Sequence, residues 1–233
     1  RYWQESGSSV GVNLVAYTMV ASPQIAYGYD ANGNQTSRTQ GSTVETYAHD
    51  YANRIVTYSD QQTAYSYIFA PSGERMAKTN LGTGDSEWYM YDGDDVVADY
   101  ALPSGGTYAL TATYANGLGI DSKIARYDPV GAPLYYIPDA LGSVHRILDG
   151  SQNVVNTYLT NAWGKSLISQ EGIPNRYGFT SRERDPESSL MHYRARSYDP
   201  RLGRFVQKDP MHESVNYYEY ARSNPVNRTD PAG

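Results

Sequence analysis

Tyr29-Asp30-Ala31-Asn32-Gly33-Asn34 sets the pattern that decides the fold. The same kind of turn residue recurs every twenty positions, at Gly33, Asn53, Gly73 and Gly93. Aromatic residues alternate before the turns, as in Tyr65 and Tyr67, and alternation at period two places both rings on one face of a strand. Gly and Asn tolerate the positive φ of a tight hairpin turn. Each unit of twenty residues therefore predicts one β-hairpin.

Hairpins at constant spacing are expected to stack edge to edge, because one hairpin alone is barely stable in water. The composition agrees, with 24 Tyr and 21 Gly but only 3 Phe and 3 Trp among 233 residues. A helical bundle would instead need Leu, Ile and Ala at helical spacing. We predict an all-β fold of serial hairpins forming an extended or coiled sheet, with an ordinary β-sandwich as the alternative. A phenolic ring can pack while its hydroxyl stays hydrogen-bonded or wet.

Several classes of protein are excluded by composition. No run approaches 18 apolar residues, so no membrane-spanning helix is predicted. The first five residues, Arg1–Glu5, lack the apolar core of a signal peptide, and the missing initiator Met points to a mature piece or a segment of a longer protein. The absence of Cys excludes disulfides and Cys-based metal or redox sites.

The charge is unevenly distributed along the chain. The net charge of −6 argues against general nucleic-acid binding. Residues 1–175 carry a balance of −8, whereas residues 176–233 carry +2, and nine of the ten basic residues in that second part are Arg. This pattern predicts a C-terminal tail folded on itself through Arg–carboxylate pairs and Arg–Tyr stacking, with a basic binding patch as the alternative.

The repeats, with their Tyr-Asp and Gly-Asn pairs, resemble the YD repeat of Rhs proteins, Tc toxin C components and teneurins. More specific segments of the Rhs repeat-associated core follow the repeats: Tyr135–Val144, Tyr177–Pro186, Leu190–Pro200 and Arg201–Pro210. The resemblance implies a poorly matched segment at residues 1–24, YD-type hairpins at 25–126, and the core domain at 127–233. It also implies that the spiralling sheet is part of a hollow β-shell enclosing a C-terminal toxin. Both faces of such a wall are expected to meet water or polar cargo, which suits Tyr better than Phe.

Related cores act as single-turnover aspartyl-type proteases that release the toxin after a final Asp-Pro-x-Gly-Leu. By resemblance, the matching carboxylates are Asp209 and Asp230, and the cleavage site lies at or just after Gly233, where the usual Leu is missing. Such a mechanism needs two carboxylates close enough to share a proton. The alternative is structural, because Asp-Pro is also a common way to begin a turn.

Three further residues are candidate helpers near the carboxylate pair: Arg204, Arg222 and Glu219. The arginines would hold a carboxylate or an oxyanion, and the glutamate would be a further acid; structural ion pairs are the alternative for the arginines. The four His residues show no metal-ligand spacing, so neither a metal nor a cofactor is expected.

We therefore expect a shell segment that is secreted or on a bacterial cell surface. Its expected partners are the cleaved C-terminal toxin and upstream shell segments, with self-association through open sheet edges and no nucleic acid. Two other functions are compatible with the residues: an extracellular adhesin that recognises its target through the repeats, and a self-assembling β-fibre without catalysis.

Overall fold

The computed structural model describes residues 24–211 and 215–233 of the chain. The poorly matched segment expected at residues 1–24 lies outside this part, except for Gln24. In the described residues, fourteen antiparallel strands form one sheet, in which each strand pairs with its neighbours in sequence. The strands are β1 (Ile25–Tyr29), β2 (Gln35–Gln40), β3 (Thr43–His49), β4 (Ile55–Ser59), β5 (Ala64–Phe69), β6 (Arg75–Asn80), β7 (Ser86–Asp92), β8 (Asp95–Leu102), β9 (Ala109–Asn116), β10 (Lys123–Tyr127), β11 (Pro133–Pro138), β12 (Val144–Asp149), β13 (Val154–Thr160) and β14 (Ser166–Glu171). We call this sheet the wall.

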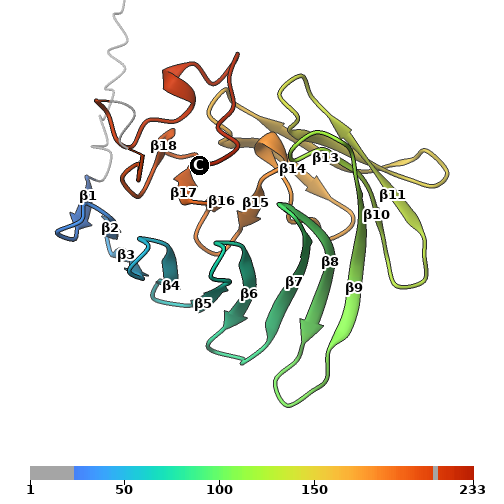
Figure 1. Cartoon of the computed structure of the whole chain (residues 1–233), viewed down its shortest axis with the longest axis horizontal. Helices are drawn as coiled ribbons and strands as arrows, with labels where there is room; N and C mark the ends of the chain where they lie inside the picture. Colours follow the sequence, from blue (N-terminus) through green and yellow to red (C-terminus); the bar gives the residue numbers. More distant parts are fainter. Residues whose placement is uncertain (1–23, 212–214) are drawn as a thin grey trace, which may run out of the picture.

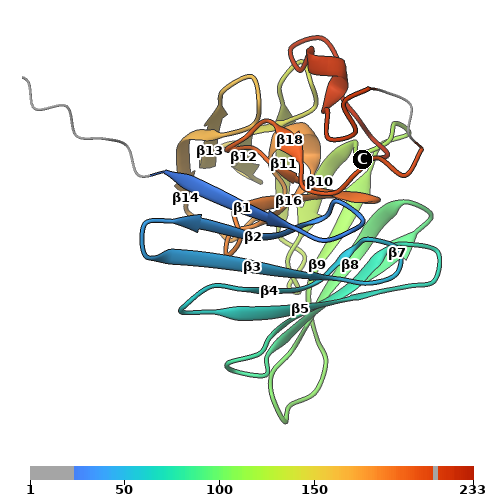
Figure 2. The same cartoon turned by 90° about the vertical axis from the view of Figure 1, so that its left-hand side faces the viewer.

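The wall curls around a second, smaller sheet (Figures 1 and 2). This inner sheet has four antiparallel strands in sequence order: β15 (Glu183–Asp185), β16 (Leu190–Tyr193), β17 (Arg196–Asp199) and β18 (Arg204–Phe205). Two short 3₁₀ turns, η1 (Phe179–Ser181) and η2 (Ala221–Ser223), flank it. The all-β expectation and the coiled sheet of serial hairpins are confirmed, and the wall is open because β1 and β14 do not pair with each other in the described chain.

All four predicted turn residues lie between successive strands of the wall, so one repeat of twenty residues is one pair of strands. In the turn after β3, the Asp50 backbone N–H donates to the Arg54 carbonyl and the Asn53 N–H donates to the Asp50 carbonyl. Asn53 has φ +62°, and the register of β3 with β4 shifts between Ala48 and His49, just before the turn. The Asp50 carboxylate accepts from two backbone N–H groups, those of Ala52 and Arg54, at 2.9 Å each. An aspartate at the start of the turn and a left-handed residue three positions later thus define the hairpin.

The concave face of the wall is lined by tyrosines whose rings are buried against the inner sheet. The hydroxyls of two of them reach Glu187. The Tyr58 hydroxyl donates to the Glu187 carbonyl at 2.8 Å, and the Tyr67 hydroxyl donates to the Glu187 carboxylate at 3.2 Å. The expectation that these rings face water on the concave side is therefore wrong, because the inner sheet occupies that side. Tyrosine suits the position because its ring packs while its hydroxyl finds a partner.

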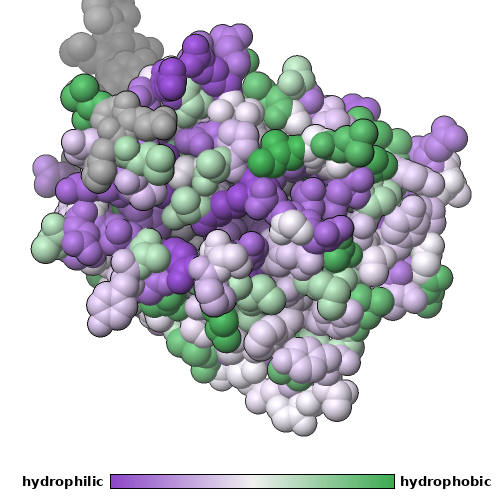
Figure 3. Space-filling view, in the orientation of Figure 1, coloured by the Kyte–Doolittle hydropathy of each residue, from purple (hydrophilic) through white to green (hydrophobic). Residues whose placement is uncertain are grey.

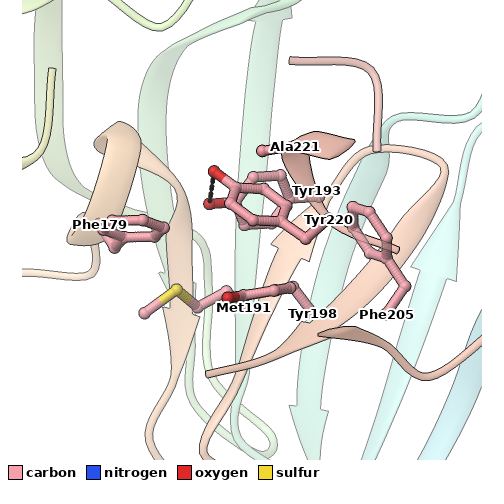
Figure 4. Packing of buried hydrophobic residues seen from close by; sticks show 7 residues of the cluster. All are labelled: Phe179, Met191, Tyr193, Tyr198, Phe205, Tyr220 and Ala221. Atoms are coloured by element: carbon pink, nitrogen blue, oxygen red, sulfur yellow. Dashed lines mark hydrogen bonds between the residues drawn. The ribbon is translucent and has the colours of Figure 1, made fainter. Parts of the chain in front are cut away.

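The inner sheet packs on both faces. Leu190 and Val206 join the wall residues Tyr47, Tyr58 and Tyr67 in one buried cluster. The opposite face carries a second buried cluster, formed by Phe179, Met191, Tyr193, Tyr198, Phe205, Tyr220 and Ala221 (Figure 4). Because side chains alternate along β16, this four-residue strand serves both clusters. The C-terminal segment is built on that second face.

The expected domain boundary at residues 126/127 falls at the end of β10, and β11 pairs directly with β10 there. The wall therefore continues across the expected boundary. The division of the chain into hairpin repeats and a core domain stays a prediction from the family resemblance. Among the described residues, no helix is long and apolar enough to span a membrane.

Candidate functional site

The structure brings Asp209 and Asp230 to the same guanidinium group. Arg196 Nη2 lies 3.7 Å from Asp209 Oδ2 and 3.4 Å from Asp230 Oδ2. Arg196 belongs to β17 and is only 5% exposed, with its guanidinium 3.8 Å from the centre of the Phe205 ring. Burial lowers the pKa of Arg196, and the two carboxylates oppose that shift. The predicted pair is thus placed together, but an arginine bridges it where a shared proton was expected.

Gly233 lies at the same place. Arg196 Nε donates to the Gly233 carbonyl oxygen at 2.5 Å, and the Gly233 N–H donates to Asp230 Oδ1 at 3.0 Å. Gly233 has φ +82°, and a Cβ built on it would lie 1.8 Å from the Tyr193 carbonyl oxygen. No side chain can occupy this position without moving the backbone of β16.

A cavity of about 520 Å³ opens beside these groups, and we call it the carboxylate cavity. It is lined by Arg196, Asp209, Glu219, Ala221, Arg222, Arg228, Thr229, Asp230 and Pro231. Two of the three candidate helpers, Glu219 and Arg222, therefore share the cavity with the carboxylate pair. Glu219 Oε1 accepts a hydrogen bond from the Ser223 hydroxyl at 2.7 Å.

Arg204, the third candidate helper, lies apart from this cavity. Its guanidinium donates to the Tyr29 hydroxyl and lies 5.2 Å from the centre of the Tyr218 ring. Only its backbone approaches the site, through a β-bridge to Glu219. Arg204 thus connects β18 to β1, and its side chain makes the structural contact that was the alternative.

The carbonyl of Pro231 is held by two arginines. Arg182 Nη2 and Arg194 Nη1 both donate to it, the latter at 2.5 Å. Both arginines also pair with Asp121: Arg182 Nη2 lies 2.6 Å from Oδ2, and Arg194 Nη2 lies 3.0 Å from Oδ1. We call Asp121, Arg182 and Arg194 the C-terminal clamp. In addition, the Ala195 N–H donates to the Ala232 carbonyl at 3.2 Å.

The clamp borders a second cavity, of about 660 Å³, which is lined by residues of both the wall and the inner sheet. Figure 3 shows hydrophilic residues gathered across the middle of this face of the molecule, where Figure 1 places the C-terminus. Burial raises the pKa of Asp121, while Arg182 and Arg194 oppose the shift. Burial also lowers the pKa of Arg182. Asp121 and Arg182 are therefore partly removed from water, and each is stabilised in its charged form by the other.

A separate charge cluster fastens the inner sheet to the wall. The Arg75 guanidinium lies 2.6 Å from the carboxylates of both Glu183 and Asp185. Arg176 pairs with Glu183 at 2.9 Å and with Asp99 at 2.8 Å. Burial alone would raise the pKa of Glu183, but Arg176 and Arg75 hold it well below its ordinary range. Arg–carboxylate pairs do hold the C-terminal part, as predicted, but these pairs join it to the wall, whereas the sequence predicted a tail folded on itself.

Arg196 and the C-terminal clamp were not predicted from the sequence. The one relevant signal in the sequence was the concentration of Arg after residue 175, which indicates ion pairs but not which carboxylate each Arg contacts. Among the described residues, no group of three or more His, Asp and Glu is arranged to hold a metal ion.

Comparison with known proteins identifies the family. Residues 12–129, half of the chain, match the family model described as the teneurin YD-shell. The chain belongs to the YD-shell family. The fold agrees: the Tc holotoxin pore of Photorhabdus luminescens superposes with a TM-score of 0.69 at 18% identity, covering 88% of this chain and 10% of that one.

Two curated relatives of this YD-shell chain are named as toxins or nucleases. The tRNA nuclease WapA of Bacillus subtilis is 30% identical over 242 residues, which cover 98% of this chain and 10% of WapA. The double-stranded DNA deaminase toxin A of Burkholderia cenocepacia is 25% identical over 255 residues, which cover 90% of this chain and 17% of that protein. This chain thus spans a tenth of the length of WapA.

Proposed function

We propose that this YD-shell segment encloses a C-terminal toxin polypeptide and releases it by cleaving its own chain near Gly233. The observation that carries the cleavage proposal is the arrangement at Arg196, which contacts Asp209, Asp230 and the Gly233 carbonyl at once. The enclosing role is supported by the curl of the wall and by the toxin and nuclease names of the relatives.

The proposed reaction is hydrolysis of one peptide bond at or just after Gly233. One carboxylate of the pair takes a proton from water as the water oxygen adds to the scissile carbonyl carbon. The other carboxyl supplies a proton, the C–N bond breaks, and the downstream amine leaves protonated. The carboxyl group formed upstream keeps the water oxygen. Arg196 balances the charge of the pair and fixes the Gly233 carbonyl. Because the scissile bond belongs to the same chain, each molecule reacts only once.

The proposal is tested by expressing the natural protein with the residues that follow Gly233 and comparing it with Asp209→Asn and Asp230→Asn. Asp128→Asn is the matched control, because Asp128-Pro129 is the same dipeptide in an exposed hairpin turn of the wall. We expect the parent and the control to yield a fragment whose intact mass places the cut near Gly233. An intact parent, or variants that cleave as fast as the parent, would refute self-cleavage.

Self-association is a second candidate role, favoured by the two open edges of the wall. β1 and β14 each pair with one neighbour, and every residue of β14 is exposed. Edge strands offer unpaired backbone groups to another strand, from an upstream shell segment or from another copy. Light scattering at rising concentration tests association between copies, and a monomer at all concentrations would exclude it.

A further inference from the structure

The C-terminal clamp joins three parts of the chain that are distant in sequence. Asp121 belongs to the loop between β9 and β10 of the wall, whereas Arg182 precedes β15 and Arg194 follows β16 in the inner sheet. The ion pair between Asp121 and Arg194 spans 73 residues, and the contact from Arg194 to Pro231 spans a further 37. The wall thus reaches the C-terminal segment through two arginines of the inner sheet.

The geometry makes the two arginines depend on Asp121. Both guanidinium groups donate to one oxygen atom, the Pro231 carbonyl, so their positive charges lie close together. Arg182 is only 5% exposed and is stacked over the Tyr193 ring, at 5.0 Å from the ring centre. A buried cation without a counter-charge is strongly unfavourable. Asp121 supplies that counter-charge: Oδ2 pairs with Arg182, and Arg194 donates to Oδ1 at 3.0 Å and to Oδ2 at 3.4 Å.

We propose that Asp121 is a positioning residue that couples folding of the wall around the inner sheet to self-cleavage. The clamp fixes the Pro231 carbonyl, two residues before Gly233, and so holds the Gly233 carbonyl on Arg196 beside the carboxylate pair. A chain whose wall has not yet folded around the inner sheet lacks Asp121 at this place. It would therefore not present the scissile bond, and release of the enclosed polypeptide would wait for the shell to form. This coupling rests on the proposed self-cleavage.

The backbone at Asp121 makes a clean substitution available. Asp121 has φ +58°, a left-handed conformation that Asn tolerates as well as Asp. Asp121→Asn therefore removes the charge while keeping shape and backbone. Asp94→Asn is the matched control, because Asp94 lines the same large cavity and, within the described chain, its carboxylate forms no ion pair. Arg194 Nη2 does contact the Asp94 backbone carbonyl, at 3.4 Å, but this substitution leaves the carbonyl in place.

Two readouts separate the clamp from the cleavage chemistry. The first is the rate of self-cleavage in the natural protein, which we expect Asp121→Asn to slow by about tenfold or more, equivalent to about 1.4 kcal/mol of activation free energy. The second is hydrogen exchange of the Ala195 amide, whose acceptor is the Ala232 carbonyl. That exchange should be about tenfold faster in Asp121→Asn, with Asp94→Asn unchanged in both readouts.

A double-mutant cycle with Arg194→Gln distinguishes positioning from general destabilisation. If Asp121 acts through Arg194, the two substitutions together slow cleavage by less than the product of their single effects. Arg194→Gln alone also tests the clamp should Asp121→Asn fail to fold. Normal cleavage and normal Ala195 exchange in the folded variants would overturn the clamp and leave self-cleavage standing. An unsubstituted protein that does not cleave, with faster exchange in Asp121→Asn, would overturn self-cleavage and confirm that the clamp holds the segment.

Discussion

Replacing His192 with Phe should make the fold less sensitive to acid. His192 lies on β16, is buried, and packs against the Phe69 ring with 5.8 Å between ring centres. Burial, reinforced by the nearby Arg75 and opposed by Glu183, lowers the pKa of His192 to about 3. The imidazole is therefore neutral in the folded protein over most of the acidic range.

The size of the effect follows from proton linkage. An unfolded His has a pKa of about 6.5, so between that pH and the folded value of about 3 the unfolded chain binds more protons. The free energy of unfolding consequently falls as the pH is lowered through this window. Each pH unit costs about 1.4 kcal/mol, so His192 should account for a loss of about 3 kcal/mol between pH 7 and 4.5.

The assay is denaturant unfolding of the parent and of His192→Phe at these two pH values. Other carboxylates titrate in both proteins, so the difference between the proteins isolates His192. His192→Gln separates packing from titration, because it also lacks a titratable nitrogen but fills the site differently. We expect both variants to lose about 3 kcal/mol less than the parent on acidification. Equal losses in all three proteins would refute the assignment of a strongly lowered pKa.

Three further outcomes follow from the contacts. Arg75→Met should cost about 3–5 kcal/mol of unfolding free energy, because in the described chain Asp185 has no other ion pair; denaturant unfolding measures this loss. Asp50→Ala should still fold but lose about 1 kcal/mol of unfolding free energy in the same assay, because it removes the acceptor for two turn N–H groups. Asp50→Asn keeps an acceptor oxygen and should lose less. Gly233→Ala should displace the C-terminal segment, because its Cβ would collide with the Tyr193 carbonyl; cleavage about tenfold slower or worse, with faster amide exchange, is expected.

The hairpins could be predicted because their determinants are local. A turn is specified within five residues: in the β3–β4 turn, Asp50 accepts the N–H bonds and Asn53 supplies the positive φ. Alternating tyrosines on either side then fix which face of the strand packs. Repetition of that short pattern was enough to predict serial hairpins that pair edge to edge, whereas the spiralling of the sheet was implied only by the family resemblance.

The site could be predicted only in part, because its decisive contacts join distant residues. The resemblance named Asp209 and Asp230, and the structure places both at Arg196. Arg196 itself is one Arg among nine in the C-terminal part, and nothing local distinguishes it from Arg204, which contacts Tyr29 instead. Choosing between them requires knowing that β17 is central in the inner sheet and β18 is at its edge.

The uneven charge of the chain acquires a physical meaning from these contacts. Carboxylates on three different hairpins of the acidic wall each hold an arginine of the C-terminal part: Glu45 holds Arg201, Asp99 holds Arg176, and Asp121 holds Arg182 together with Arg194. Buried ion pairs add little net stability, but an arginine placed beside the wrong residue would leave a charge unpaired at a high cost. The pairs therefore select one seating of the inner sheet within the wall. That seating brings the C-terminal segment to the carboxylate cavity, so the charge pattern that marks the two parts of the sequence also determines where the candidate site forms.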